Sequence, residues 1–429
     1  MKNRKRLLSA LLAISMAASV PVCASAADGA EKVEGVTLTF VTSTGWVNQG
    51  SNIDDELNAR FEEETGIKID MQCLPDDQYT TVLKTKLSTG EVPDIFMVNG
   101  GVGAQKFLPE KYFADLSDEE WVSRYVDYAK EGTTIDGKIM GLMRWCVDGW
   151  GILYNEDLYN ELGLSVPTTQ EEFLNVCEVL KENGYTPIYE AGKETWHWAI
   201  WLSNYGPYAA TQHEGLYEQL NNNTAKFADV PEFEEFLNQL KDLYDKGYLG
   251  ENALANTWDA TWGMMGEGKA GNIVVYQNYQ NEIAEKYPDS NAENWGMYPI
   301  PLAGNNVFSH SAGGNMMVAY KDSENLEYVK QYFNFLTRED NLKDFYAGRT
   351  QLQANPSFVD VEGQPSAAAV AMEENCPGGS GIDLEFGVAY WDNTQIGSYI
   401  QEMLLGSKTA KEVLEAIDAD RQKMFDAQE

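Results

Sequence analysis

The chain has 429 residues, and 43% of them are hydrophobic, which is enough apolar material for more than one core. Its formal net charge is −36, so its surface repels nucleic acid and anionic lipid, and both are poor partners. The five cysteines show no C-x-x-C spacing, which argues against a metal site built on them.

The N-terminus predicts an exported protein. Four basic residues within the first six precede an apolar run at 7–20 and the small-residue sequence Ala24–Ala26. This order is typical of a secretory signal peptide at residues 1–26, followed by a polar tether at 27–35. Cleavage after Ala26 is favoured over a lipid anchor at Cys23, because a valine rather than a small residue precedes that cysteine. The mature chain is expected to be secreted, periplasmic or on the cell surface.

Strands and helices then alternate along the chain. Runs of β-branched and apolar residues predict strands at 36–41, 67–71 and 94–98, and helical spacing of apolar residues predicts a helix after each of the first two. This β-α-β-α-β order indicates an α/β fold with a parallel sheet covered by helices on both faces. Ligands of such sheets bind at the carboxyl ends of the strands.

The same pattern recurs further along. Capping boxes predict helices starting after Thr169 and after Thr409, each with a glutamate three residues on, and Pro231 begins another helix. Strands are predicted at 151–154 and 273–276. About 400 residues remain after export, too many for one core, so we expect two lobes.

Seven short stretches occur in an order that is typical of one family. They are Leu57–Ile69, Gly90–Ile95, Asp136–Lys138, Leu153–Leu158, Val166–Phe173, Gly266–Ala270 and Gly313–Gly314. With them the chain resembles the extracellular solute-binding proteins of bacterial ABC importers, in the sugar-binding, maltose-binding-protein-like group.

The resemblance implies an α/β, two-lobed periplasmic-binding-protein (Venus flytrap) fold whose discontinuous lobes are joined by hinge crossings. The implied ranges are 36–145 and 312–348 for the N-terminal lobe, 149–298 and 357–429 for the C-terminal lobe, and 146–148, 299–311 and 349–356 for the crossings. It also implies a monomeric substrate-binding component that captures a neutral sugar or oligosaccharide by hinge closure. That component passes its cargo to a membrane permease and ATPase, is not an enzyme, and needs neither cofactor nor metal.

The expected ligand site combines aromatic rings with polar side chains, because sugar rings stack their C–H faces on aromatics and their hydroxyls need hydrogen-bond partners. Trp46 follows the first strand in a polar loop, and Asn99 ends the third strand. The resemblance adds Asp148, Trp196, Trp198, Tyr276, Asn278, Tyr279, Trp391 and Asp392. Trp196 and Trp198 alternate, so one of them is expected in the core. The family's usual tryptophan after the strand at 273–276 is missing, and Tyr279 is the preferred replacement.

Two other function classes stay open at this point. Arg144, near the first crossing, is placed to bind the carboxylate of an amino acid or peptide, and a polyamine is a further solute. A secreted glycoside hydrolase is disfavoured, because no G-x-S-x-G, H-E-x-x-H or P-loop motif is present and the three histidines are not spaced as metal ligands. The remaining cysteines are predicted to be buried free thiols: Cys73, Cys146, Cys177 and Cys376.

Overall fold

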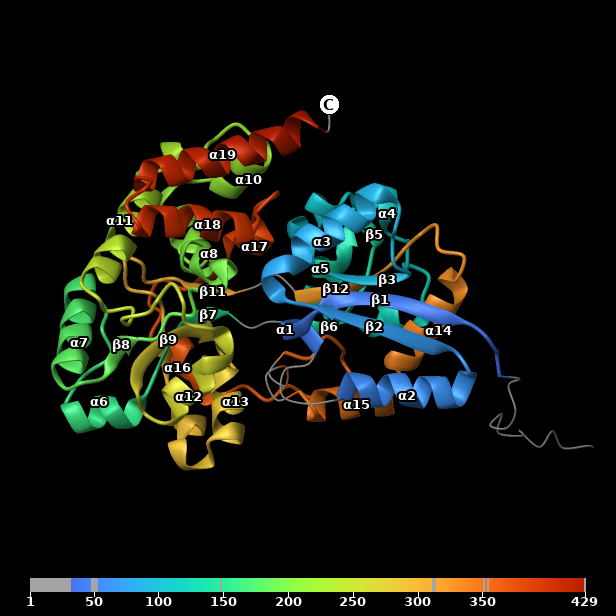
Figure 1. The fold of residues 1–429 in the computed structure, drawn as a ribbon, viewed down its shortest axis with the longest axis horizontal. Coiled ribbons are helices and arrows are strands. Elements are labelled where there is room, and N and C mark those ends of the chain that lie inside the picture. Colours follow the sequence, from blue (N-terminus) through green and yellow to red (C-terminus); the bar gives the residue numbers. More distant parts are fainter. Residues whose placement is uncertain are drawn as a thin grey trace, which may run out of the picture.

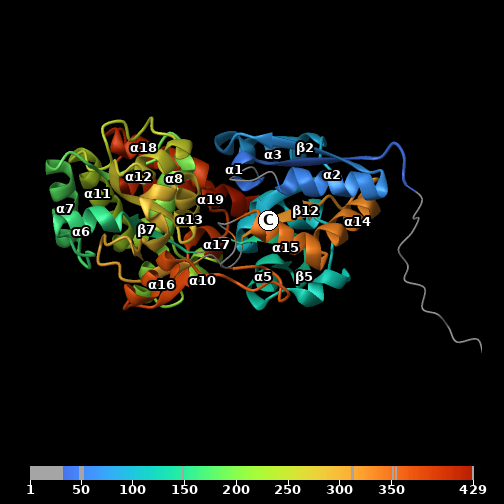
Figure 2. The same ribbon diagram turned by 90° about the horizontal axis from the view of Figure 1, so that it is seen from below.

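The computed structural model describes residues 32–47, 53–146, 149–310, 314–349, 352 and 355–427. They form two α/β lobes that lie side by side in both views (Figure 1, Figure 2), so the predicted two-lobed α/β architecture is confirmed. The predicted signal peptide and most of the tether lie outside the described residues.

The first lobe is built from two separate parts of the chain. Its elements are β1 (Thr37–Ser43), α1 (Thr44–Val47), α2 (Ile53–Thr65), β2 (Lys68–Leu74), α3 (Asp76–Thr89), β3 (Ile95–Asn99), η1 (Gly101–Phe107), α4 (Pro109–Tyr112), η2 (Glu120–Arg124), α5 (Asp127–Thr133), β4 (Thr134–Ile135), β5 (Lys138–Ile139), β6 (Leu142–Cys146), β12 (Gly314–Ala319), α14 (Leu326–Leu336) and α15 (Glu339–Ala347).

The second lobe holds the rest of the elements. They are β7 (Trp150–Tyr154), α6 (Glu156–Leu162), α7 (Gln170–Glu182), β8 (Thr186–Ile188), α8 (Thr195–Ser203), α9 (Gly206–Gln212), α10 (Leu216–Asn221), η3 (Phe227–Asp229), α11 (Pro231–Asp245), η4 (Trp258–Ala260), α12 (Thr261–Gly266), β9 (Ala270–Tyr276), α13 (Tyr279–Lys286), η5 (Pro288–Ser290), η6 (Ala292–Asn294), β10 (Met297–Tyr298), β11 (Phe308–His310), α16 (Ala367–Glu374), β13 (Ser380–Ile382), α17 (Leu384–Gly387), α18 (Asn393–Leu404) and α19 (Ala410–Asp426).

The sheet of the first lobe has the strand order β2-β1-β3-β12-β6. Strand β1 runs parallel to β2 and β3, as the β-α-β-α-β order predicts, but β12 runs antiparallel to both β3 and β6. The prediction of a purely parallel sheet is therefore wrong. Strand β12 reaches the sheet from the second lobe and not through a crossover helix, so the right-handed βαβ rule does not set its direction.

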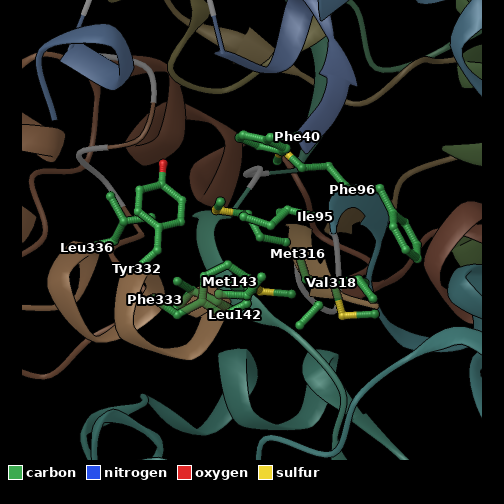
Figure 3. Packing of buried hydrophobic residues seen from close by; sticks show 14 of the residues in the cluster. Phe40, Ile95, Phe96, Leu142, Met143, Met316, Val318, Tyr332, Phe333 and Leu336 are labelled. Carbon is green, nitrogen blue, oxygen red and sulfur yellow. The ribbon is translucent and has the colours of Figure 1, made fainter. Parts of the chain in front are cut away.

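The core of the first lobe lies between this sheet and its helices (Figure 3). Residues of β1, β3, β6 and β12 pack against the apolar face of α14. The labelled members of this core are Phe40, Ile95, Phe96, Leu142, Met143, Met316, Val318, Tyr332, Phe333 and Leu336.

The sheet of the second lobe has the order β10-β7-β9-β8, with β9 parallel to β8 and antiparallel to β7. Every residue of β9 is buried, because core residues cover both faces of this sheet. The predicted capping boxes are confirmed at Thr169–Glu172 before α7 and at Thr409–Glu412 before α19.

The chain passes between the lobes at places that differ in part from the predicted crossings. It leaves β6 and enters β7 around residues 147–148, which lie outside the described part. The predicted crossing at 299–311 is wrong for residues 299–310, which belong to the second lobe. Ile300 and Leu302 are buried in a core of that lobe, and β11 pairs with β13 of the same lobe.

The third crossing also lies later than predicted. Phe358 is fully buried in the core of the first lobe, against Tyr125 at 5.0 Å between ring centroids. The N–H of Val359 donates to the carbonyl of Arg124 at 3.0 Å. Contact with the second lobe resumes at Ser366, whose Oγ donates to the carbonyl of Gln277 at 2.8 Å. Residues 357–361 therefore belong to the first lobe, which corrects the predicted boundary at 357.

A buried ion network lies inside the first lobe. The carboxylate of Asp54 accepts hydrogen bonds from Arg144 Nη2 at 3.1 Å and from Arg349 Nη1 at 3.2 Å. The guanidinium of Arg349 also donates to the carbonyls of Trp46 and Val47, each at 3.0 Å. Arg144 lies within β6 and Arg349 lies just after α15, so Asp54 on α2 joins two segments of this lobe that are far apart in the sequence.

The prediction of buried free thiols is confirmed for Cys177 and Cys376. Cys73 is half-buried and not fully buried as predicted. The side chain of Cys146 lies outside the described part.

Candidate functional site: a cavity between the lobes

A cavity lies between the two lobes and takes its walls from both. It encloses about 1000 Å³, open solvent at its mouth included. The first lobe contributes the ends of β1 and β3 with parts of α1, α3 and η1, and the second lobe contributes β7, α8, η4, β9, α17 and the start of α18. Its position at the carboxyl ends of the parallel strands β1 and β3 agrees with the general rule for α/β sheets.

One wall is an aromatic platform, by which we mean Trp150, Trp196, Trp258 and Tyr276 of the second lobe. Trp196 lies 5.3 Å from Trp258 and 6.3 Å from Trp150 between ring centroids, and Trp150 lies 5.4 Å from Tyr276. The contacts are edge-to-face, the arrangement that aromatic quadrupoles favour. The rings come from four elements, so the platform exists only in the folded lobe.

The opposite wall combines aromatic and acidic groups of the first lobe. Trp46 packs edge-on against Tyr79 at 5.0 Å. The carboxylate of Asp76 accepts hydrogen bonds from Ser43 Oγ and from the N–H of Gly45, the latter at 2.8 Å. Burial raises the pKa of Asp76, although these hydrogen bonds oppose the shift. Asp76 is thus a fixed acceptor at the cavity wall.

Three contacts join the lobes beside the cavity. Lys84 Nζ lies 3.0 Å from Asp392 Oδ2, Lys106 Nζ donates to the carbonyl of Trp391 at 3.0 Å, and Asn99 Nδ2 donates to Glu385. Burial alone would raise the pKa of Asp392, but the positive charges of Lys106 and Lys84 outweigh it and lower that pKa. For Glu385 burial prevails and raises the pKa.

Five of the ten predicted site residues line this cavity. They are Trp46, Asn99, Trp196, Tyr276 and Asp392. Asp148 lies outside the described residues. Trp196 and Trp198 point to different sides of α8, as their alternation predicts: Trp196 lines the cavity, while Trp198 is fully buried and donates its indole N–H to Gly192.

The other predicted contacts do not reach the cavity wall. Trp391 is fully buried, packs on Phe227 at 5.7 Å and donates its indole N–H to Asn393. Tyr279 is fully buried and its hydroxyl bonds to Thr261. Asn278 is buried and does not line the cavity. The structure therefore contradicts ligand contact by Trp391 and Tyr279, whose rings pack in hydrophobic cores of the second lobe, and it places Trp198 as the core member of its pair.

Five of the cavity residues that the sequence analysis missed bring an aromatic ring or a charge to it: Trp150, Trp258, Asp76, Lys106 and Glu385. Trp150 is half-buried at the start of β7, and its place beside the predicted crossing at 146–148 is a signal that could have identified it. The other four lie in segments whose facing depends on contacts with distant parts of the chain.

Arg144 is not available to a ligand. Its guanidinium is buried, pairs with Asp54 and lies 4.0 Å from the ring of Phe345. It does not line the cavity. The amino-acid alternative therefore loses the residue on which it depended.

A buried carboxyl group lies behind the platform. Glu282 on α13 accepts hydrogen bonds from the hydroxyl of Tyr276 and from Trp262 Nε1, the latter at 3.2 Å. Burial raises the pKa of Glu282 to about 7, against the opposing effects of Tyr276 and Arg349. The folded protein therefore keeps a proton on this group at a pH at which the unfolded chain has lost it.

This shift gives a pH dependence of stability. A pKa raised on folding adds stability that is fully present below the unfolded value near 4.5 and is lost as pH rises through about 7. The free energy of unfolding, measured in urea at pH 5 and pH 8, should fall more with pH in the native chain than in Glu282→Gln. The exposed Glu285→Gln on the same helix is the control, and equal pH dependence in the native chain and Glu282→Gln would contradict the assignment.

No group of three or more histidine, cysteine, aspartate or glutamate side chains in the described ranges could hold a metal ion. Within the same ranges, none of the helices has the length and hydropathy required to cross a membrane.

Comparisons with known proteins agree with the fold. The profile of the bacterial extracellular solute-binding protein family matches residues 44–343. The melibiose/raffinose/stachyose-binding protein MelE of Bacillus subtilis is 23% identical over 79% of this chain and 78% of its own length. The multiple sugar-binding protein of Streptococcus mutans is 29% identical, but the match spans only 36% of that protein and 35% of this chain.

A solved structure shares the whole fold. A sugar transporter protein from Bacillus licheniformis, crystallised with stachyose, superposes with a TM-score of 0.73 at 21% identity, over 90% of this chain and 99% of its own. The seven sequence stretches, the two-lobed fold and the profile match over most of the chain lead to the same result: the chain belongs to the family of bacterial extracellular solute-binding proteins.

Proposed function

We propose that the protein is the extracytoplasmic substrate-binding component of an ABC transporter and that the cavity between its lobes holds a neutral sugar or oligosaccharide. Its relatives include a melibiose/raffinose/stachyose-binding protein and a multiple sugar-binding protein, which supports this choice of ligand. So does the chemistry of the cavity, in which a broad aromatic wall faces polar side chains.

The observation that carries the proposal is a pair of indole N–H groups in the platform. Nε1 of Trp196 and Nε1 of Trp258 are buried and have no hydrogen-bond partner among the described residues. Leaving a buried donor unpaired costs about 1–3 kcal/mol, so an acceptor from the ligand would be favourable there. A sugar supplies hydroxyl and ring oxygens for such donors and apolar C–H faces for the rings.

The charges of the cavity favour a ligand without negative charge. The carboxyl groups of Asp76, Glu385 and Asp392 line it, against the single ammonium group of Lys106. An anionic ligand would meet like charges in a partly dehydrated site, which is costly.

Titration calorimetry with a panel of raffinose, stachyose and maltotriose, set against glutamate and arginine, tests the proposal. Binding of at least one sugar, with the sugar recovered intact after incubation, supports it. Binding of the amino acids alone, or sugar cleavage that tracks the protein through purification, would contradict it.

Within this proposal, closure of the lobes encloses the sugar, and a separate permease and ATPase receive it. Small-angle scattering should show a smaller radius of gyration with saturating sugar.

Cleavage of the signal peptide after Ala26 belongs to the same proposal. Mass spectrometry of the native N-terminus distinguishes a chain that begins at Ala27 from one that begins at a lipid-modified Cys23.

The substitution Trp258→Phe should weaken sugar binding by about 1–2 kcal/mol, roughly tenfold in Kd, because it removes one unpaired indole donor and part of a stacking surface. Calorimetry measures the change. Trp295→Phe is the matched control: its indole N–H is also buried without a partner among the described residues, but Trp295 does not line the cavity. Equal losses in both variants would assign the effect to general packing.

A further inference from the structure

A single histidine lies beneath the aromatic platform and contacts all three of its tryptophans. His197 on α8 is fully buried and does not line the cavity. Its ring centroid lies 5.2 Å from Trp196, 5.3 Å from Trp258 and 6.2 Å from Trp150. A side chain that touches three neighbouring rings from below can fix their positions relative to one another.

Both nitrogens of the His197 ring face acceptors. Nδ1 lies 2.7 Å from Oε1 of Glu190, and Nε2 lies 3.0 Å from the carbonyl oxygen of Val274. A carbonyl oxygen and an ionised carboxylate only accept hydrogen bonds, so a ring that satisfies both must donate from both nitrogens. Only the doubly protonated imidazolium does so.

The surroundings of the ring stabilise that charge. The charged groups facing His197 are Glu190, which follows β8, and Glu194, which precedes α8. β9 contributes the Val274 carbonyl, while β7 and η4 contribute aromatic rings. Burial alone would lower the pKa of His197, but the attraction of Glu190 and the hydrogen bonds to Glu190 and Val274 outweigh it and raise that pKa. Cations are also attracted to indole rings.

Glu190 is itself held in place. It is fully buried, and its second oxygen, Oε2, accepts the indole N–H of Trp201 at 2.8 Å. The neighbouring Glu194 accepts the backbone N–H of Trp258 at 3.0 Å, at the start of the segment that carries that ring. The pair of Glu190 and His197 is thus rigidly connected to α8, β9 and η4.

We propose that His197 is a positioning residue of the ligand site: held as an imidazolium between Glu190 and the Val274 carbonyl, it sets the arrangement of Trp150, Trp196 and Trp258. The effect on sugar affinity rests on the proposed function, whereas the charge of His197 and its effect on the tryptophans do not.

The first experiment reads the charge directly in the native protein. The chain has only three histidines, so ¹⁵N-histidine labelling gives three imidazole spin systems, assigned with His213→Gln and His310→Gln. At pH 7.5 both ring nitrogens of His197 should show N–H resonances. A spectrum in which one of its nitrogens is unprotonated, as in a neutral ring beside a protonated Glu190, would overturn the proposal.

The second experiment uses Glu190→Gln, which removes the charge that holds the proton and leaves one acceptor oxygen where the carboxylate offers two, to Nδ1 and to Trp201. In this variant the near-UV circular dichroism of the tryptophans should change more between pH 5.5 and 8.5 than in the native chain, in which Glu282 behind the platform titrates but His197 does not. This measurement needs no sugar. His213→Gln, which alters a half-buried histidine paired with Glu232, should behave like the native chain.

Raffinose and stachyose affinity over the same pH range completes the test. In Glu190→Gln we expect affinity close to native at pH 5.5 and at least tenfold weaker at pH 8.5. A constant loss at every pH, with an unchanged near-UV spectrum, would show that Glu190 and His197 merely fill space and would overturn the proposal. If neither sugar binds the native chain, the proposed ligand fails, while the spectral experiments still decide the role of His197.

Discussion

Replacing Trp391 by alanine should lower the free energy of unfolding by about 3–5 kcal/mol, the usual cost of removing a large aromatic side chain from a core. The indole is fully buried against Phe227, and its N–H bonds to Asn393. Urea denaturation followed by circular dichroism measures the change. Sugar affinity of the protein that stays folded should change much less than in Trp258→Phe.

Leu405→Ala is the control for this experiment. Leu405 is 64% exposed just after α18, so its truncation should change stability by less than about 0.5 kcal/mol. Near-native stability of Trp391→Ala, together with a large loss of affinity, would instead place the ring at the ligand.

The substitution Asp54→Asn should destabilise the protein by about 3–5 kcal/mol, because it removes the carboxylate that pairs with the buried guanidinium groups of both Arg144 and Arg349. Asparagine has nearly the same shape, so the loss reports charge and not volume. Thermal and urea unfolding measure it.

Asp55→Asn offers a matched control one residue along α2, where the side chain is exposed. It should be nearly neutral. Equal stability of the two variants would mean that the buried arginines do not depend on Asp54. Arg349 also donates to the carbonyls of Trp46 and Val47, and Trp46 lines the cavity. A shift of Arg349 in Asp54→Asn should therefore weaken sugar binding as well.

The parts of the fold that sequence predicts best are those with local causes. Thr169 with Glu172 and Thr409 with Glu412 form capping boxes because the partners are three residues apart, and no distant contact is needed. The strands β1, β2 and β3 follow from their apolar patterns in the same way. Family resemblance adds the two-lobed arrangement, which local patterns do not contain.

What sequence could not predict depends on contacts between distant segments. Trp391 and Trp258 are each followed by an aspartate in the sequence, yet only Trp258 lines the cavity, because Phe227 and its neighbours cover Trp391. Phe358 follows a predicted crossing but packs on Tyr125 far upstream. The periodicity of the sequence shows which side chains share one face of a helix or strand. Tertiary packing then determines whether that face contacts a core, a cavity or solvent.

The antiparallel strand β12 has a consequence for the order of folding. It lies inside the first sheet, hydrogen-bonded to β3 on one side and β6 on the other, with Met317 opposite Met97 and Leu142. Most of the second lobe is encoded between β6 and β12. An N-terminal fragment that ends before β12 therefore lacks an interior strand, and its β3 and β6 keep unpaired edges. During synthesis the first lobe, although it begins the chain, cannot complete its sheet until most of the second lobe has been made, and these late, non-local pairings slow its folding.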